Sequence, residues 1–356
     1  MSLNSRGKRA DKAVYTAWLS KRPRGFGFMK IAIIGAGLSG MTAAKILTDR
    51  LGYKAQIKVF EKSRGAGGRM STRRTDEYEF DHGAQYFTAK GPAFKTAVDA
   101  AITEGHVTTW DGTAKYLKDS TLEDDTGGAR YVSTPRMNSW IKSMAGGLDI
   151  KTSLRVNAIV KDGHSWTLQF TDQPEQTGFD AVICAAPAPQ AEVLLAPTGF
   201  EALDAIQNTK MDACFAVMLG FKEPLDLPWH TLRSPDGAAS WIAVNSTKPG
   251  RPDERTTLMV HSGPNWSNTY AEHDKQELQE KIVEAASELT AIDLTTASYS
   301  TIHRWLYAAV SKGAEQPCVA DNSRKIIACG DWCLGGRVEG AWLSGKAAAE
   351  HVVSWA

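Results

Sequence analysis

The chain has 356 residues, and its 41 basic and 40 acidic side chains give a formal net charge of +1. This balance excludes a nucleic-acid-binding protein that relies on bulk charge. At roughly 150 residues per domain the length predicts two domains, and no apolar run approaches the ~18 residues that would cross a bilayer.

The cysteines and histidines give no sign of a disulfide framework or a metal site. The five cysteines are widely spread without a C-x-x-C pair, and none of the eight histidines stands at an i, i+4 or H-x-H spacing from another. This pattern favours reduced thiols in a cytoplasmic protein, and it predicts that no metal is bound.

The first 28 residues differ in composition from the rest of the chain. They carry seven basic residues and one acidic residue, a net charge of +6. The apolar run from Ala13 to Leu19 is too short for the core of a signal peptide and is interrupted by Thr16. Because a fold begins directly after Met29, we interpret residues 1–28 as a leader or non-native extension. A basic targeting arm is the alternative.

The first folded unit is predicted to be a βαβ unit. An apolar run from Lys30 predicts a buried parallel strand and is followed by the motif G-x-G-x-x-G. Helix-forming residues with spaced apolar side chains predict a helix over 38–51, and a second strand is expected over 53–60.

The three glycines of the motif and the acid that follows predict a dinucleotide site. Gly35 permits the tight turn, Gly37 lets a diphosphate approach the backbone, and Gly40 allows the helix to pack closely on the strand. Glu61 stands 21 positions after the last glycine, where a carboxylate accepts hydrogen bonds from the adenosine ribose. With its strand, helix and acid in place, the motif becomes a specific signal.

The segment after Glu61 favours FAD over a nicotinamide cofactor. Residues 62–70 hold a second glycine cluster and end in Gly68-Arg69-Met70. Arg69 could neutralise the diphosphate of a buried FAD, and the glycines would let the loop lie against it. A flexible basic loop is the alternative.

A second cofactor segment is predicted near the C-terminus. A short apolar strand runs into Gly330-Asp331, and a helix of small residues is expected from Gly340 to about Trp355. The carboxylate would hold the ribityl and phosphate end of FAD, and the helix N-terminus would face the flavin ring. The Rossmann-type domain is therefore predicted to be discontinuous.

Four stretches resemble bacterial renalases, which are relatives of the monoamine oxidase and polyamine oxidase flavoproteins. They are GRMSTRR (68–74), FDHGAQYFTAK (80–90), HRWLYA (303–308) and CGDWCLGGRVEGAWLSG (329–345). The resemblance extends over 29–356. It implies a noncovalent FAD and oxidation of the 2-dihydro and 6-dihydro isomers of NAD(P)H to NAD(P)+, with electrons passed to dioxygen to give hydrogen peroxide. Direct hydride transfer of this kind needs no strong general base.

Together with the resemblance, the motifs give an expected set of cofactor contacts. These are Gly35, Gly37, Ser39, Gly40, Glu61, Lys62, Gly68, Arg69, Met70, Val156, Gly330, Asp331, Glu339, Gly340 and Ala341. Cys333 lies in the same region, but we interpret it as a buried thiol rather than a covalent flavin attachment.

The expected substrate side of the flavin has three parts. By resemblance, Gln85, Tyr86, Phe87 and Thr88 lie beside the ring. Trp305 and Tyr307 alternate on a predicted strand, so both could stack on a flat ring. Asn245 and His261 end two strand patterns and could orient a carboxamide by hydrogen bonding, without acting as acid or base. Packing in the core is the competing interpretation for the aromatic residues, and a structural role is the competing interpretation for His261.

The sequence as a whole predicts an α/β protein with a Rossmann-type FAD-binding domain and an α+β substrate domain built on a mostly antiparallel sheet. The first domain is expected to comprise 29–90, 146–190 and 320–356, and the second 91–145 and 191–319. The expected partners are a small dinucleotide substrate and dioxygen, with no nucleic acid and no membrane. The alternatives are an amine oxidase, for which no amine cage or flavin-side lysine can be located, and a noncatalytic flavin-binding sensor.

Overall fold

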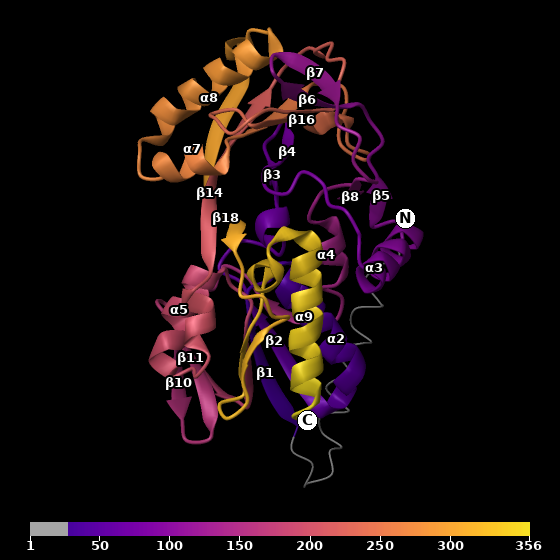
Figure 1. Ribbon diagram of the computed structural model, residues 1–356. Coiled ribbons are helices and arrows are strands. Elements are labelled where there is room, and N and C mark those ends of the chain that lie inside the picture. Colours follow the sequence, from indigo (N-terminus) through magenta and orange to yellow (C-terminus); the bar gives the residue numbers. More distant parts are fainter. Residues whose placement is uncertain (1–27) are drawn as a thin grey trace.

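The computed structural model describes residues 28–356, and the predicted leader therefore lies almost wholly outside the described residues. Figure 1 shows two layered bodies stacked along the long axis of the molecule, with the C-terminus in the lower one. Within 28–356 no helix is both long and apolar enough to cross a membrane.

The lower body is built on a six-stranded sheet in the order β19-β20-β13-β1-β2-β9. The strands are β1 (Met29–Ile34), β2 (Ala55–Phe60), β9 (Asp149–Lys151), β13 (Ala181–Cys184), β19 (Val319–Asp321) and β20 (Ile326–Ala328). All neighbours pair in parallel except β19 and β20. The central strands are apolar because both faces are covered, which confirms the predicted Rossmann-type sheet.

Two helices pack on one face of this sheet, α2 (Leu38–Leu51) and α9 (Arg337–Val353). They approach closely because α9 has a glycine at the contact: a Cβ on Gly345 would lie 2.2 Å from the Ser39 carbonyl oxygen. The bounds of α2 confirm the prediction for 38–51. Helix α9 begins three residues before the predicted Gly340, because the chain turns at Gly336 with a φ of +95°.

A three-stranded sheet, two helices and the short 3-10 turn Ala196–Thr198 complete the lower body. The sheet consists of β10 (Val156–Asp162), β11 (Ser165–Phe170) and β12 (Gln176–Phe179), and the helices are α5 (Ala188–Leu195) and α6 (Leu203–Gln207). Their apolar residues share one hydrophobic cluster with the face of the parallel sheet that lies opposite α2 and α9.

The upper body contains a seven-stranded, mostly antiparallel sheet in the order β18-β14-β17-β16-β15-β6-β7. Its strands are β6 (Ala114–Lys118), β7 (Thr121–Asp124), β14 (Lys210–Gly220), β15 (Thr231–Arg233), β16 (Trp241–Val244), β17 (Thr257–His261) and β18 (Tyr299–Lys312). Helices α7 (Pro264–Thr269) and α8 (Lys275–Thr290) pack beside it, and β14 and β18 reach toward the lower body (Figure 1). The mostly antiparallel sheet confirms the predicted second fold element.

A smaller group of elements connects the two bodies. It consists of the ribbon of β3 (Thr72–Arg74) and β4 (Glu79–Asp81), the pair β5 (Val107–Thr109) and β8 (Tyr131–Ser133), and helices α3 (Pro92–Thr103) and α4 (Ser139–Ser143). The region 91–119 thus holds helix α3 and the strands β5 and β6.

Candidate functional site

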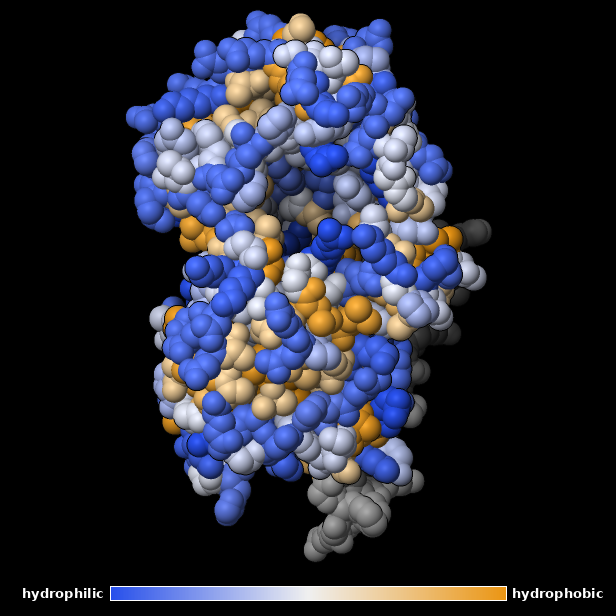
Figure 2. Space-filling view, viewed as in Figure 1, coloured by the Kyte–Doolittle hydropathy of each residue, from blue (hydrophilic) through white to orange (hydrophobic). Residues whose placement is uncertain are grey.

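A large cavity lies between the two bodies, and we call it the central cavity. Its volume is about 1760 Å³, and its wall includes Gly37 and Arg69 from the lower body and His261 and Trp305 from the upper body. Figure 2 shows this hollow, with hydrophilic residues gathered around it. Single small ligands occupy pockets of roughly 300–1,000 Å³, so the central cavity has room for a dinucleotide and a second ligand.

The glycine motif forms one end of the central cavity, and its glycines have different surroundings. Gly35 has a φ of +107°, and its N–H donates to the Phe60 carbonyl oxygen at 2.8 Å. A Cβ on Gly40 would lie 2.0 Å from the Gly35 carbonyl oxygen, so this glycine serves packing. A Cβ on Gly37 would meet no atom within 4 Å. The open space at Gly37, at the N-terminus of α2, fits a diphosphate.

Glu61 joins the loops around this space. Its side chain is 6% exposed, and each carboxylate oxygen accepts one backbone N–H, from Ala36 at 2.8 Å and from Ser63 at 2.7 Å. A carboxylate oxygen can accept a second hydrogen bond, so Glu61 can shape the turn and still receive a ribose hydroxyl. The residues present therefore fit the adenosine end of FAD.

Arg69 and Asp331 meet in a bidentate ion pair. Nη1 and Nη2 of Arg69 donate to the two carboxylate oxygens of Asp331 at 2.8 and 2.6 Å. This pair ties the second glycine cluster to the end of β20. The position of Arg69 in the sequence predicted that its charge neutralises the FAD diphosphate. The structure modifies that assignment, because a carboxylate already balances the guanidinium.

Most of the expected cofactor residues line the central cavity. They are Gly35, Gly37, Ser39, Glu61, Lys62, Gly68, Arg69, Met70, Val156, Gly330, Asp331 and Ala341. The structure corrects the prediction for Glu339, whose carboxylate accepts the N–H groups of Lys90 at 2.9 Å and Gly91 at 2.7 Å and so holds the start of α3. Gly340 is buried where a Cβ would contact Leu334, and neither residue belongs to the cavity wall.

The structure corrects the prediction for Phe87 and its neighbours. Phe87 is 4% exposed, and its ring lies 5.7 Å from that of Trp140 and 6.1 Å from that of Phe94, within the hydrophobic core. Tyr86 packs on Trp241 instead, with ring centroids 5.7 Å apart. Neither of these residues, nor Gln85 or Thr88, belongs to the cavity wall. The competing interpretation, core packing, holds for Phe87.

Asn245 is also a structural residue rather than a cavity residue. It is fully buried, its amide oxygen accepts from the Asp81 N–H at 3.2 Å and from Lys248 Nζ at 3.1 Å, and its amide nitrogen donates to the Glu79 carbonyl at 3.0 Å. Because its hydrogen-bonding groups are occupied within the protein, the predicted contact with a carboxamide is wrong.

Asp81 is the centre of a buried network behind the cavity wall. Lys248 Nζ lies 3.3 Å and Arg251 Nη2 lies 2.7 Å from its Oδ2. Burial alone would raise the pKa of Asp81, but these two cations lower it to about 2. Burial lowers the pKa of Lys248 to about 8 against the pull of Asp81. Lys248 also donates to Gln85 Oε1 at 3.0 Å, so the network fixes the Gln85 side chain.

Three histidines line the central cavity, His82, His261 and His303, of which only His261 was predicted from the sequence. The ring of His82 lies 5.1 Å from that of His303 and stacks on that of Trp305 at 5.2 Å, while Trp305 Nε1 donates to the His82 carbonyl at 2.8 Å. Burial lowers the pKa of His261 to about 3 and that of His82 and His303 to about 4. The site therefore presents neutral imidazoles at physiological pH.

The wall of the central cavity is strongly basic. Its nine cationic side chains are Lys62, Arg64, Arg69, Arg73, Arg74, Lys142, Arg155, Arg304 and Arg337. Only four carboxylates share the wall, those of Glu61, Asp76, Glu79 and Asp331. A concave wall with this excess of positive charge attracts anionic ligands.

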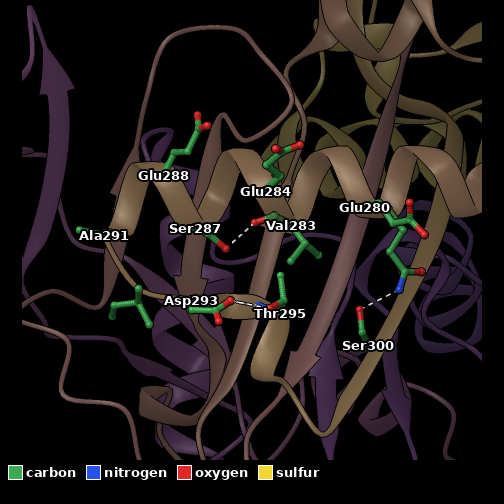
Figure 3. A pocket seen from close by; sticks show the side chains of 11 residues that line it. Glu280, Val283, Glu284, Ser287, Glu288, Ala291, Asp293, Thr295 and Ser300 are labelled. Carbon is green, nitrogen blue, oxygen red and sulfur yellow. Dashed lines mark hydrogen bonds between the residues drawn. The ribbon is translucent and has the colours of Figure 1, made fainter.

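A second hollow of about 630 Å³ lies far from these residues, between α8 and the turn at 293–295. Figure 3 shows the carboxylates of Glu280, Glu284 and Glu288 along one side of α8, and a hydrogen bond from the Thr295 N–H to the Asp293 carboxylate across the turn. No histidine or cysteine lines it.

The parallel sheet, the dinucleotide turn and the large cavity define a dinucleotide-binding protein with a two-body architecture. A family model of flavin containing amine oxidoreductases matches residues 108–353, and a model of an NAD(P)-binding Rossmann-like domain matches 33–101. The chain belongs to the flavin containing amine oxidoreductase family. Membership of this family makes it an FAD-dependent oxidoreductase.

Two curated relatives match a short part of the chain. Prenylcysteine oxidase 1 of Bos taurus is 44% identical over 54 residues, which are 15% of this chain and 10% of that protein. A 4,4'-diapophytoene desaturase of Staphylococcus aureus is 42% identical over 55 residues, with the same two shares. The chain thus matches about a tenth of the length of these relatives.

Solved structures match over nearly the whole chain. A putative protoporphyrinogen oxidase from Exiguobacterium sp. 255-15 has a TM-score of 0.75 at 13% identity and covers 93% of this chain and 100% of its own. Cyclohexylamine oxidase from Brevibacterium oxydans has a TM-score of 0.69 at 15% identity, covering 92% and 99%. Reduced UDP-galactopyranose mutase has a TM-score of 0.72 at 14% identity, and the match covers 92% of this chain and 94% of that chain. At these identities the likeness shows the fold.

Proposed function

We propose that the protein oxidises isomeric dihydronicotinamide dinucleotides, the 2-dihydro and 6-dihydro forms of NAD(P), to NAD(P)+. Dioxygen takes up the electrons and is released as hydrogen peroxide. The resemblance to bacterial renalases suggests this substrate class. The observation that carries the proposal is the charge of the central cavity, whose wall has nine cationic side chains and four carboxylates.

This charge favours a dinucleotide over an amine. Alkylamines are protonated near neutral pH, as is a lysine side chain with a pKa of about 10.4, and a basic wall repels them. A dinucleotide carries a diphosphate that the same wall attracts. Lys248 does not supply a cavity-side lysine, because it is fully buried and donates to Asp81, Gln85 and Asn245.

The residues of the site fit an oxidation that removes a hydride and no separate proton. When bound, FAD supplies the acceptor for that hydride. Trp305 and Tyr307 line the cavity with aromatic surface on which a flat dihydropyridine ring can stack. His261, kept neutral by burial, can orient the ring by hydrogen bonding and has too low a pKa to act as a base near neutral pH.

A substrate panel followed by oxygen consumption and peroxide formation tests the proposal. We expect turnover with 2-dihydro- and 6-dihydro-NAD(P), one peroxide per substrate oxidised, and no turnover with primary, secondary or polyamine substrates. The basic wall also predicts that the apparent KM for a dinucleotide rises with ionic strength. Turnover of amines alone would replace the proposal with an amine oxidase, and no turnover of either class would favour a flavin-binding sensor.

A further inference from the structure

We propose that Arg73 binds the diphosphate of the dinucleotide substrate. The protein is thereby selective for dihydronicotinamide substrates that carry phosphate over the corresponding riboside. This inference rests on the proposed function and adds a residue and a ligand group to it. The residue lies on β3, within the ribbon that connects the two bodies.

All three residues of β3 line the central cavity, and Arg73 is the middle one. Thr72 pairs with Asp81 and donates to its carboxylate at 2.6 Å, which ties the strand to the buried network. Successive side chains of a strand point to opposite faces. Arg73 therefore shares its face with Phe80, which stacks on Tyr299 of β18 at 5.5 Å.

His303 and Trp305 follow Tyr299 on the same strand, and both line the central cavity together with Arg73. The rings of His303 and Trp305 lie 4.3 Å apart and form an aromatic wall with His82. Burial lowers the pKa of His303, and the nearby charge of Arg73 lowers it further. A cation and a stacking surface thus face the cavity from two adjacent elements.

Arg73 has no carboxylate partner among the residues that the structure describes. Within residues 28–356 no carboxylate forms an ion pair with its guanidinium, although the residue is half-buried. Among the nine cations of the cavity wall, Arg69 pairs with Asp331 and Arg304 with Glu272, whereas the other seven, Arg73 included, form no ion pair within the described residues. A half-buried guanidinium that lines a cavity and has no carboxylate partner among the described residues is suited to an anionic ligand.

A diphosphate is the anion that fits this position. The guanidinium presents several N–H donors in a planar fork that matches two phosphate oxygens. The diphosphate of FAD has its own place at the open turn of Gly37, where α2 begins. A substrate whose ring stacks on the aromatic wall carries its diphosphate on the same molecule, so one ligand can satisfy both the wall and Arg73.

The test compares ligands with and without phosphate on the Arg73→Ala and Arg73→Lys variants. Anaerobic flavin reduction gives the Kd of 6-dihydro-NAD and of the corresponding dihydronicotinamide riboside. We expect Arg73→Ala to raise the Kd of the dinucleotide ~10- to 100-fold, as for a lost hydrogen bond to a charged group, and to change the Kd of the riboside less than twofold. Arg73→Lys should recover part of the loss, because it restores the charge without the fork.

Arg255→Ala is the matched control. Arg255 pairs with Glu77 at the turn of the same ribbon at 3.3 Å and lies outside the cavity wall, so this change removes one positive charge at a distance from the proposed site. We expect less than a twofold change with either ligand. If Arg73→Ala and Arg255→Ala weaken dinucleotide binding equally, the effect is one of bulk charge. If Arg73→Ala raises the Kd of the dinucleotide and of the riboside equally, Arg73 has a structural role. Either result overturns the proposal.

Binding of ADP-ribose separates this proposal from the proposed function, because this ligand has a diphosphate and no nicotinamide. Calorimetry or the perturbed flavin spectrum of the oxidised holoenzyme gives its Kd without turnover. Binding that Arg73→Ala weakens at least tenfold supports the diphosphate site even if no dihydronicotinamide reduces the flavin. Binding that is absent from the wild type, or equal in wild type and Arg73→Ala, refutes it. Unchanged flavin content and Tm confirm that each variant is folded.

Discussion

The glycines of the dinucleotide turn allow a cofactor contact to be separated from a packing contact by single methyl groups. Gly37→Ala adds a Cβ that meets no protein atom within 4 Å, at a backbone φ of −75° that any residue adopts. Gly40→Ala adds a Cβ only 2.0 Å from the Gly35 carbonyl oxygen and 3.2 Å from Ala185 Cβ. The first change should therefore act on FAD and the second on the fold.

The structure sets the expected magnitudes. Gly37 is the N-cap residue of α2, where alanine costs about 1 kcal/mol, so the apoprotein should lose little of a typical stability of about 5–15 kcal/mol. The new methyl group occupies the space proposed for the diphosphate. Overpacking costs roughly 1–3 kcal/mol, which raises the Kd of FAD roughly 5- to 140-fold. Gly37→Val should abolish binding.

Gly40→Ala should behave in the opposite way. The nearest atom belongs to the backbone, so no side chain can rotate to relieve the overlap, and the start of α2 must move away from the turn after β1. We expect a loss of apoprotein stability above the ~3 kcal/mol upper range of ordinary overpacking. Loss of flavin would follow from the loss of the fold.

Two measurements decide between these roles. Circular dichroism of the apoproteins gives the Tm, and quenching of FAD fluorescence on titration with apoprotein gives the Kd. The reasoning predicts a nearly unchanged Tm with weak FAD binding for Gly37→Ala, and a strongly lowered Tm for Gly40→Ala. It is refuted if Gly37→Ala binds FAD as tightly as the wild type, or if Gly40→Ala melts at the wild-type temperature.

Three further predictions concern the site, the cofactor and the N-terminal segment. His261→Ala should slow anaerobic flavin reduction roughly two- to tenfold, the effect of a lost neutral hydrogen bond of ~0.5–1.5 kcal/mol. Burial lowers the pKa of His261 to about 3, so the imidazole stays neutral above that pH. The pH profile of the rate should therefore show no limb near neutrality that comes from the titration of His261. A thousandfold loss together with the disappearance of such a limb would identify an obligate proton-transfer group. Acid precipitation should release all flavin to the supernatant, because burial raises the pKa of Cys333 to about 12 and leaves no thiolate for attachment; a yellow pellet would contradict this. A protein that starts at Met29 should keep its flavin and turnover, and a large loss of either would show that residues 1–28 contribute.

The cofactor half of the fold could be predicted from sequence because its signals are local. The strand, the glycine turn, the helix over 38–51 and Glu61 occur in one short stretch, and each has a fixed spacing. The connecting region gave weaker signals. Strand β7 is exposed along its whole length, so it has no alternation of apolar and polar residues, and β5 has only three residues. Such strands are defined by their partners rather than by their own pattern.

The substrate side was harder to predict because its contacts join distant segments. The hydrogen bond from Trp305 to His82 spans 223 positions, and the contact between Asn245 and Asp81 spans 164. A polar residue at a strand end can face a cavity or a buried network, and only the partners distinguish the two. His303 had a usable signal, since it stands two residues before Trp305 on the same strand face.

Anaerobic mixing of the holoenzyme with single substrates, followed by flavin absorbance, tests the central claim most directly. The account predicts that 2-dihydro- and 6-dihydro-NAD(P) bleach the flavin with one equivalent of substrate, that NAD(P)+ appears in equal amount, and that air restores the colour. Bleaching by simple amines, with no response to the dihydronicotinamide isomers, would contradict it.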